Sequence, residues 1–294
     1  MQAGRRVAVH VCKGGGFPQQ ARFEQSIVGH CCPAQKDGGI VHCALKPLQF
    51  LVSDREFPGS TGLLLKRPPF CPIKHLTAEQ TASLPAEARR QGVDVGVAVL
   101  LESGSGKVLL TRRARTLSLF PNSWVPPGGH IEPEEELLEA GLRELQEETG
   151  LQLKDGEFSW QPLALWESVY PPRLSQGLPQ RHHIVAYLHL ALHENHQQLQ
   201  ARLRPNEAEV NAITWLDRPT VASISATEDA EGEAPGMGKE APSTVSIVEL
   251  ENGSAKTVAI PTAAFLATAQ GGNVERVSTG TKYALRQWLN MSSL

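Results

Sequence analysis

The segment of residues 128–151, GGHIEPEEELLEAGLRELQEETGL, constrains the fold of this chain more than any other. Its composition predicts a strong helix over residues 134–149. Glu144, Glu147 and Glu148 stand at positions i, i+3 and i+4, which are neighbours on one face of a helix. Three carboxylates there repel one another unless a cation neutralises them, and carboxylate oxygens suit hard ions such as Mg²⁺ or Mn²⁺. The spacing therefore predicts a divalent metal site on this helix.

The other positions of this helix indicate how it docks. We expect an apolar stripe facing a sheet, made of Leu137, Leu138, Leu142 and Leu145. Gly150 is suited to a left-handed turn that ends the helix. Read as charge alone, the segment is also typical of an acidic helix that merely faces solvent. The spacing of its fixed positions separates the two interpretations.

The segment resembles the Nudix box, Gly-x5-Glu-x7-Arg-Glu-apolar-x-Glu-Glu-x-Gly-apolar. Every fixed position is filled, by Gly129, Glu135, Arg143, Glu144, Leu145, Glu147, Glu148, Gly150 and Leu151. The resemblance implies an α/β fold, an α/β/α sandwich with a mixed sheet that carries the box as a loop–helix–loop. It also implies that Glu144, Glu147 and Glu148 hold the divalent ions and act in catalysis, and that Gly129, Glu135, Arg143 and Gly150 are structural. The reaction it implies is attack of water on one phosphorus of a diphosphate.

General chemistry agrees with this reaction. Hydrolysis of a diphosphate needs neutralised oxygens and an in-line nucleophile, and a bound Mg²⁺ serves both needs. The general base is left open between Glu147 and Glu148 on the helix and Glu167 and Glu209 outside it.

The organisation of the chain follows from shifts in composition. We expect a small, mainly β N-terminal module and connector over residues 1–91 and the Nudix core over residues 92–218. Residues 219–244 include an acidic, Pro- and Gly-rich stretch that we interpret as a disordered insertion. Residues 245–294 form a C-terminal extension, with a strand pair over 245–260 and a final helix from Thr281 to Leu289 that packs on the core.

Within these parts we expect further strands. In the N-terminal module they are residues 5–12, 23–28 and 40–52, and in the core they are residues 92–103, 107–113, 158–166, 182–192 and 213–216. Residues 77–91 are predicted as part helix and part linker.

The substrate is predicted from a closer likeness. The stretches VDVGVAV, LLTRRARTLS, NSWVPPGGH, LWESVYPPRLSQGLPQRHHIV and RVSTGTKYAL resemble mRNA-decapping members of the superfamily. This implies capped RNA as substrate, with 7-methyl-GDP and 5′-monophosphate RNA as products. A methylated guanine is cationic and stacks on aromatic rings. The candidate substrate contacts are Arg113, Phe120, Trp124, Trp166 and Tyr170, although core packing is the ordinary role of such aromatic residues.

Two alternatives stay open. The first is hydrolysis of NADH or another dinucleotide, because a smaller N-terminal module before a Nudix core resembles the NADH pyrophosphatase branch. The Ser-Gln-Pro-Trp-Pro-Phe-Pro array of that branch is absent; the corresponding stretch begins at Leu165 and reads LWESVYPP. The second is a binding module that has lost catalysis, against which the intact set of box glutamates argues.

Charge and cysteine usage bound the partners. The net charge of −3 provides no global basic field to hold long nucleic acid, so we expect no DNA partner and only local contacts with capped RNA or a small nucleotide. The five cysteines favour a reducing compartment over disulfides, and a zinc site of Cys31, Cys32, His42 and Cys43 is a lesser alternative. We expect no membrane segment, a cytoplasmic location with a peroxisomal one as alternative, and allow for a homodimer.

Overall fold

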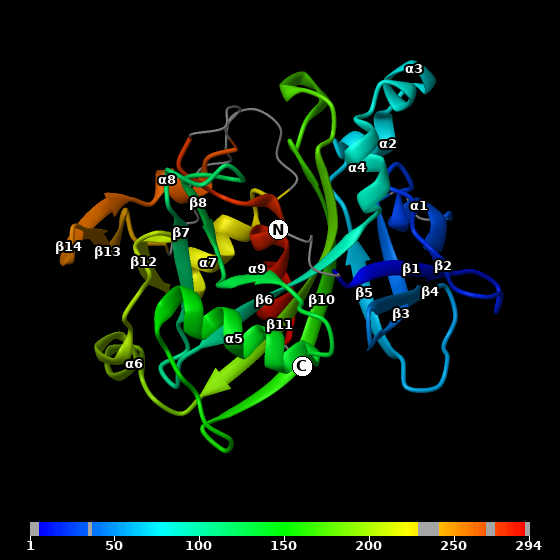
Figure 1. Ribbon diagram of the computed structural model, residues 1–294. Helices are drawn as coiled ribbons and strands as arrows, with labels where there is room; N and C mark the ends of the chain where they lie inside the picture. The colour runs from blue at the N-terminus through cyan, green and yellow to red at the C-terminus, as the bar shows by residue number, and fades with distance from the viewer. Residues whose placement is uncertain (1–5, 35–36, 229–240, 269–273, 292–294) are drawn as a thin grey trace. The chain divides into compact units, whose positions relative to one another are not determined.

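The computed structural model describes residues 6–34, 37–228, 241–268 and 274–291 (Figure 1). The chain forms two compact units, each built from several stretches. Unit 1 comprises Met1–Val97, Gly129–Ala140 and Ala164–Tyr187, and unit 2 comprises Ala98–Gly128, Gly141–Leu163 and Leu188–Leu294. Five elements contribute residues to both units, namely β6 (Asp94–Glu102), β9 (Gly128–His130), α5 (Leu137–Thr149), β10 (Phe158–Tyr170) and β11 (Arg181–Leu192).

Unit 1 is built on a mixed sheet, in which the strand order from β10 outward is β5-β3-β4-β1-β2. The strands of the N-terminal region are β1 (Ala8–Cys12), β2 (Gln19–Gln20), β3 (Gly38–Lys46), β4 (Gln49–Ser53) and β5 (Thr61–Lys66). The pairs β1–β4 and β10–β5 are parallel, whereas β3 is antiparallel to both of its neighbours. This mainly β region agrees with the predicted N-terminal module.

The helices of unit 1 are short. They are α1 (Ile27–Cys31), α2 (Pro72–His75), α3 (Ala78–Ala82), α4 (Ala86–Gln91) and the 3₁₀ turn Leu174–Gln176. The strand predicted over residues 23–28 is wrong, because helix α1 begins at Ile27 after Ser26 caps its first turn. Strand β9 (Gly128–His130) leads into the Nudix box.

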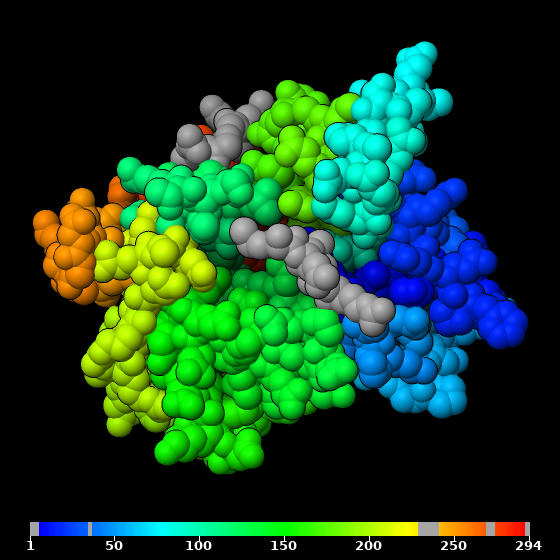
Figure 2. All heavy atoms as spheres, in the orientation of Figure 1, coloured from blue at the N-terminus to red at the C-terminus, as the bar shows by residue number. Residues whose placement is uncertain are grey.

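Unit 2 contains a second run of strands in the order β14-β13-β12-β7, with β8 paired to β7 and β15 paired to β8. Their bounds are β7 (Val108–Arg113), β8 (Ser123–Val125), β12 (Val210–Leu216), β13 (Thr244–Glu251), β14 (Ser254–Pro261) and β15 (Arg276–Val277). The β8–β15 pair is parallel and the others are antiparallel, so the sheet is mixed as predicted. The strand pair expected over residues 245–260 is confirmed as the hairpin of β13 and β14, which lies at the surface in Figure 2.

The helices of unit 2, besides most of α5, are α6 (His196–Arg202), α7 (Arg218–Ser225), α8 (Ala263–Leu266) and α9 (Thr279–Met291). Helix α9 confirms the predicted final helix. Helix α7 begins where Asp217 caps the amide of Thr220 and Pro219 occupies the first turn. The helix includes the start of the segment predicted as the acidic insertion, and residues 229–240 of that segment lie outside the described residues.

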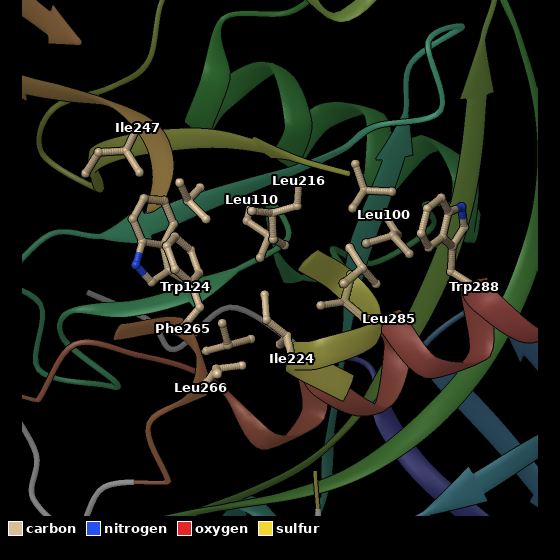
Figure 3. Packing of buried hydrophobic residues seen from close by; sticks show 14 of the residues in the cluster. Leu100, Leu110, Trp124, Leu216, Ile224, Ile247, Phe265, Leu266, Leu285 and Trp288 are labelled. Carbon is tan, nitrogen blue, oxygen red and sulfur yellow. The ribbon is translucent and has the colours of Figure 1, made fainter. Parts of the chain in front are cut away.

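One hydrophobic core joins α7, α8 and α9 to one face of the unit 2 sheet (Figure 3). Trp124 from β8 stacks on Phe265 from α8 with ring centroids 5.1 Å apart, and Leu285 and Trp288 of α9 are fully buried. The other face of the sheet carries Thr111, which reaches helix α5. Among the described helices, none is both long and apolar enough to cross a bilayer.

Candidate active site

The Nudix helix is delimited by two left-handed residues. Helix α5 begins at Leu137 and not at residue 134, because Glu134 has a φ of +71° and cannot belong to a right-handed helix. The helix ends at Thr149, and Gly150 follows with a φ of +69°. A Cβ atom on Gly150 would lie 2.6 Å from the carbonyl oxygen of Arg204, so only glycine fits there. The predicted role of Gly150 as the helix stop is confirmed.

The three glutamates of α5 lie in different environments. Glu148 is 5% exposed, whereas the side chain of Glu144 is 13% exposed and that of Glu147 is 56% exposed. The predicted division into a carboxylate face and a leucine face is therefore only partly right. Leu145 is fully buried as expected, but Ala140 and Glu148 also face the interior. The other leucines of the predicted stripe, Leu137, Leu138 and Leu142, are half-buried.

A loop from later in the chain brings a fourth carboxylate to this helix. The backbone amide of Arg204 donates to the carbonyl of Thr149 at 2.7 Å, and that of Asn206 donates to the carbonyl of Glu148 at 2.9 Å. Glu209 follows in the same loop, and its carbonyl accepts from the amide of Ala114 at 2.8 Å. These bonds fix the loop between the end of α5 and the end of β7. Glu209 lies close enough to affect the pKa values of Glu144 and Glu148 on α5 and of Arg113 on β7.

The end of β7 adds two groups to the cluster. Thr111 Oγ1 lies 3.5 Å from Glu148 Oε2. Arg113 donates from Nε to the carbonyl of Leu119 at 3.1 Å, and the carboxylates of Glu148 and Glu209 act on its charge. Arg113 therefore lies within electrostatic range of the acidic cluster. Its contact with a substrate stays a prediction.

Electrostatics show that these carboxylates are crowded together. Burial, opposed by the charge of Arg113 and reinforced by those of Glu144 and Glu209, raises the pKa of Glu148 to about 8. Burial also raises the pKa of Glu144. The ion pair with Arg143 opposes this increase, and the neighbouring charges of Glu147 and Glu209 reinforce it. Acids that disfavour one another's ionisation in a desolvated place are typical of functional sites.

Arg143 binds two of these carboxylates. Its Nη1 donates to Glu144 Oε1 at 2.9 Å and to Glu147 Oε2 at 3.3 Å. Within the described ranges, no three or more His, Cys, Asp or Glu side chains are arranged to hold a metal ion as they stand. The donor set nevertheless fits a hard divalent cation, because it gathers carboxylate oxygens whose mutual repulsion such an ion would relieve.

Glu167, a candidate general base, belongs to a different environment in unit 1. Its carboxylate is fully buried and accepts hydrogen bonds from the amides of Ile27 at 2.7 Å and Val28 at 3.0 Å. It also accepts from Ser26 Oγ at 3.2 Å and lies 3.1 Å from His182 Nε2. A carboxylate so enclosed has no access to a water molecule at the site, so its assignment as a candidate base is wrong. Glu167 instead holds the beginning of helix α1.

The predicted aromatic contacts fall into two groups. Trp124 is fully buried in the unit 2 core, and its indole Nε1 donates to Glu275 at 2.9 Å, so its assignment to base stacking is wrong. Trp166 is only 4% exposed in unit 1 and offers no ring surface to a base, which corrects that assignment too. Phe120, which has a φ of +49°, and Tyr170 are half-buried, and for them substrate contact stays a prediction.

Two further positions have structural roles. At Gly96 a Cβ atom would lie 2.7 Å from the Gly129 carbonyl oxygen, so glycine is required for this close approach. Arg112 of β7 is buried and forms ion pairs at 3.0 Å with Glu249 and Glu275. Successive side chains of β7 point to opposite faces of the sheet. Arg112 therefore joins a structural ion-pair network, and its neighbour Arg113 points toward the acidic cluster.

Comparison with known proteins agrees with this geometry. Residues 92–235 match the model of the NUDIX domain. The chain is 51% identical to the m7GpppN-mRNA hydrolase NUDT17 of Xenopus laevis over 99% of this chain and 97% of that protein. It is 52% identical to the protein of that name from Homo sapiens over 92% of this chain and 84% of that protein, and 47% identical to the one from Danio rerio over 98% and 97%. The chain therefore belongs to the Nudix family and is a Nudix hydrolase.

Proposed function

We propose that this Nudix hydrolase uses Mg²⁺ or Mn²⁺ to cleave a diphosphate linkage in the 7-methylguanosine cap of mRNA. The products would be 7-methyl-GDP and 5′-monophosphate RNA. The observation that carries the hydrolytic part is the cluster of Glu144, Glu147, Glu148 and Glu209 around the Nudix helix, with Arg113 beside it. The choice of capped RNA is supported by the names of the relatives.

Within this proposal, different residues bind the metal ion and the phosphate. Glu144, Glu147 and Glu148 would hold the divalent ion, which neutralises phosphate oxygens and acidifies a bound water. Arg113 would bind a non-bridging phosphate oxygen, since its guanidinium already lies within the influence of Glu148 and Glu209. The buried position of Glu148 excludes bulk water from its carboxylate, which strengthens its interaction with a cation.

Glu209 is the general base that the geometry favours. Arg143 binds Glu144 and Glu147, and Glu148 is buried beneath Thr111. The side chain of Glu209 makes no hydrogen bond or ion pair with the part of the chain that the structure describes, and it is half-buried. A carboxylate in this position can take a proton from the attacking water, and no structural role competes for it. Glu209→Gln should therefore lower kcat with little change in affinity for the metal.

The experiment that tests the substrate is product analysis. Methyl-capped RNA, unmethylated capped RNA and NADH are offered side by side with Mg²⁺ or Mn²⁺. Selective release of 7-methyl-GDP is the expected result. Preferential cleavage of NADH would retain the Nudix chemistry and overturn the proposed substrate.

The metal site is tested separately with the double variant Glu147→Gln/Glu148→Gln. Hydrolysis should be abolished while the fold is retained. Glu139→Gln is the matched control, because Glu139 lies exposed on the same helix and caps the amide of Glu136. Unchanged turnover in the double variant would contradict the assignment of the metal ligands.

A further inference from the structure

A row of side chains crosses three neighbouring strands of unit 2, next to the acidic cluster. Trp124 of β8 pairs with Arg112 of β7, and the amide of Asn122 donates to the carbonyl of Arg113 at 3.2 Å. Arg113 therefore lies opposite Ser123. On its other side, Ser123 is in register with Arg276 of β15. Since paired strands lie about 4.8 Å apart, Arg113, Ser123 and Arg276 form a row spanning about 10 Å.

The row lies on the face of the sheet that carries the Nudix helix. Trp124 and Val277, the residues that follow Ser123 and Arg276, are buried in the hydrophobic core of α7, α8 and α9 (Figure 3). Successive side chains of a strand point to opposite faces, so Ser123 and Arg276 point away from that core. This is the face of Thr111, whose hydroxyl lies 3.5 Å from Glu148.

The middle of the row contains a hydroxyl without a partner. Ser123 is fully buried, and its Oγ makes no hydrogen bond with any described residue. Buried hydroxyl groups in folded proteins are almost always paired, and an exception indicates a place where a water, an ion or a ligand group completes the bonding. The neighbouring Arg113 and Arg276 make an anionic oxygen the best match.

A buried lysine adds positive charge near the far end of the row. Lys282 of α9 is 3% exposed, and its Nζ donates to the carbonyl of Ala267 at 3.2 Å. No described carboxylate forms an ion pair with Lys282. Burial, reinforced by the charge of Arg276, lowers the pKa of this lysine to about 8. The charges of Lys282 and Arg276 therefore oppose each other, and an anion bound near Arg276 would relieve that repulsion.

We propose that Arg276 and Ser123, with the charge of Lys282 behind them, form a phosphate-binding subsite beside the metal cluster. Arg113 links the two, so that one phosphate chain extends from the attacked diphosphate along the row. The guanidinium of Arg276 and the hydroxyl of Ser123 donate to the phosphate oxygens, the geometry for which arginine is well suited. That the phosphate belongs to the nucleotide substrate rests on the proposed function; the existence of the subsite does not.

Binding of inorganic pyrophosphate to the full chain, without metal, tests the subsite directly. Pyrophosphate should raise the thermal unfolding midpoint of the wild type in a concentration-dependent way. Arg276→Gln should weaken the apparent affinity about tenfold, which corresponds to about 1.4 kcal/mol, and Arg276→Lys should weaken it less. Lys256→Gln is the control for net charge, because Lys256 lies exposed on the edge strand β14 of the same unit. Wild-type affinity in Arg276→Gln, or an equal loss in Lys256→Gln, would overturn the proposal.

Ser123→Ala separates a binding role from a structural one. Removal of an unpartnered buried hydroxyl should raise the unfolding midpoint of the free protein, while pyrophosphate affinity falls about threefold or more. A fall in the unfolding midpoint together with unchanged affinity would assign Ser123 to the fold and contradict the subsite.

Kinetics with capped RNA connect the subsite to the reaction. Arg276→Gln should raise KM about tenfold and change kcat much less, because the subsite holds a phosphate that does not react. If the wild type fails to cleave capped RNA but Arg276 still governs pyrophosphate binding, the proposed function fails and the subsite stands. If capped RNA is cleaved and Arg276→Gln changes neither KM nor pyrophosphate binding, the subsite fails and the proposed function stands.

Discussion

Two buried glutamates, Glu148 in unit 2 and Glu167 in unit 1, have the same side chain and opposite electrostatics. Four donors surround Glu167, and although burial opposes ionisation, the bonds from His182 and two backbone amides hold its pKa below the usual value. Glu148 has acidic neighbours and few donors, and its pKa is raised to about 8. Burial alone therefore does not distinguish a structural acid from a functional one. The balance between donors and like charges around the carboxylate does.

Removal of Glu167 should have the largest effect on stability. Glu167→Ala leaves two amides and the imidazole of His182 buried without their acceptor, so the free energy of unfolding should fall by about 4 kcal/mol. Urea denaturation measures this loss. Glu167→Gln, which retains one acceptor oxygen, should lose less. A change below about 1 kcal/mol in Glu167→Ala would show that the four hydrogen bonds do not hold α1 in solution.

Replacement of Glu148 should have the opposite result, with a large loss of activity and no loss of stability. Glu148→Gln should lower kcat/KM about 10³-fold, which corresponds to about 4 kcal/mol of lost transition-state stabilisation. The metal-free protein should become no less stable, because burial and the charges of Glu144 and Glu209 already favour the uncharged form of Glu148, which glutamine resembles. Steady-state kinetics and unfolding in a chelator measure the two quantities. A large loss of stability would place Glu148 in the same class as Glu167.

The contrast between these acids also explains what the sequence could and could not predict. The spacing of Glu144, Glu147 and Glu148 is local to one helix, so the box and its end at Gly150 could be predicted from pattern alone. Helix α1 could not, because the carboxylate that binds its first amides comes from Glu167, 140 residues along the chain from Ile27. The stretch of residues 23–28, FEQSIV, is equally compatible with a strand, and only this long-range contact decides between strand and helix.

The same limit applies to the aromatic candidates and to the row of Arg113, Ser123 and Arg276. Trp124 was assigned to a base because it lies next to the box, but its side-chain direction depends on pairing with β15, which begins at Arg276. That pairing turns Trp124 into the core and Ser123 toward the acidic face. No local pattern around residue 124 contains this information, since the partner strand β15 is only two residues long. It begins directly after Glu275, which is 151 residues along the chain from Trp124.

Acid should destabilise the protein partly through Glu167. A carboxyl group whose pKa is lowered on folding stabilises the native state above its unfolded value of 4.5, and this stabilisation is lost as the pH falls through the lower folded value. The wild type should therefore lose stability below about pH 4.5, at up to about 1.4 kcal/mol per pH unit from this group. Glu167→Gln should have a shallower acid limb when unfolding free energies are measured across this range. An unchanged slope would remove Glu167 from the acid response.

The smallest change in unfolding free energy is expected at Glu102. This carboxylate has fewer hydrogen-bond donors than Glu167. This half-exposed carboxylate accepts from His189 Nε2 at 2.7 Å and from Trp288 Nε1 at 2.8 Å; although burial opposes ionisation, these two bonds lower its pKa. Trp288→Phe keeps most of the buried ring and removes one bond to a charged acceptor, so it should cost about 2 kcal/mol.

Trp215→Phe is the matched control, because the indole of Trp215 donates to the neutral amide oxygen of Gln200 at 3.0 Å. A neutral bond at a half-buried position should cost about 1 kcal/mol or less. The difference between the two losses in unfolding free energy then measures what the negative charge of the acceptor contributes, because both variants make the same change of ring. Equal losses would mean that the negative charge of Glu102 adds nothing to the attachment of helix α9. The stabilisation by Glu167 would then also come from the number of its hydrogen bonds and not from its charge.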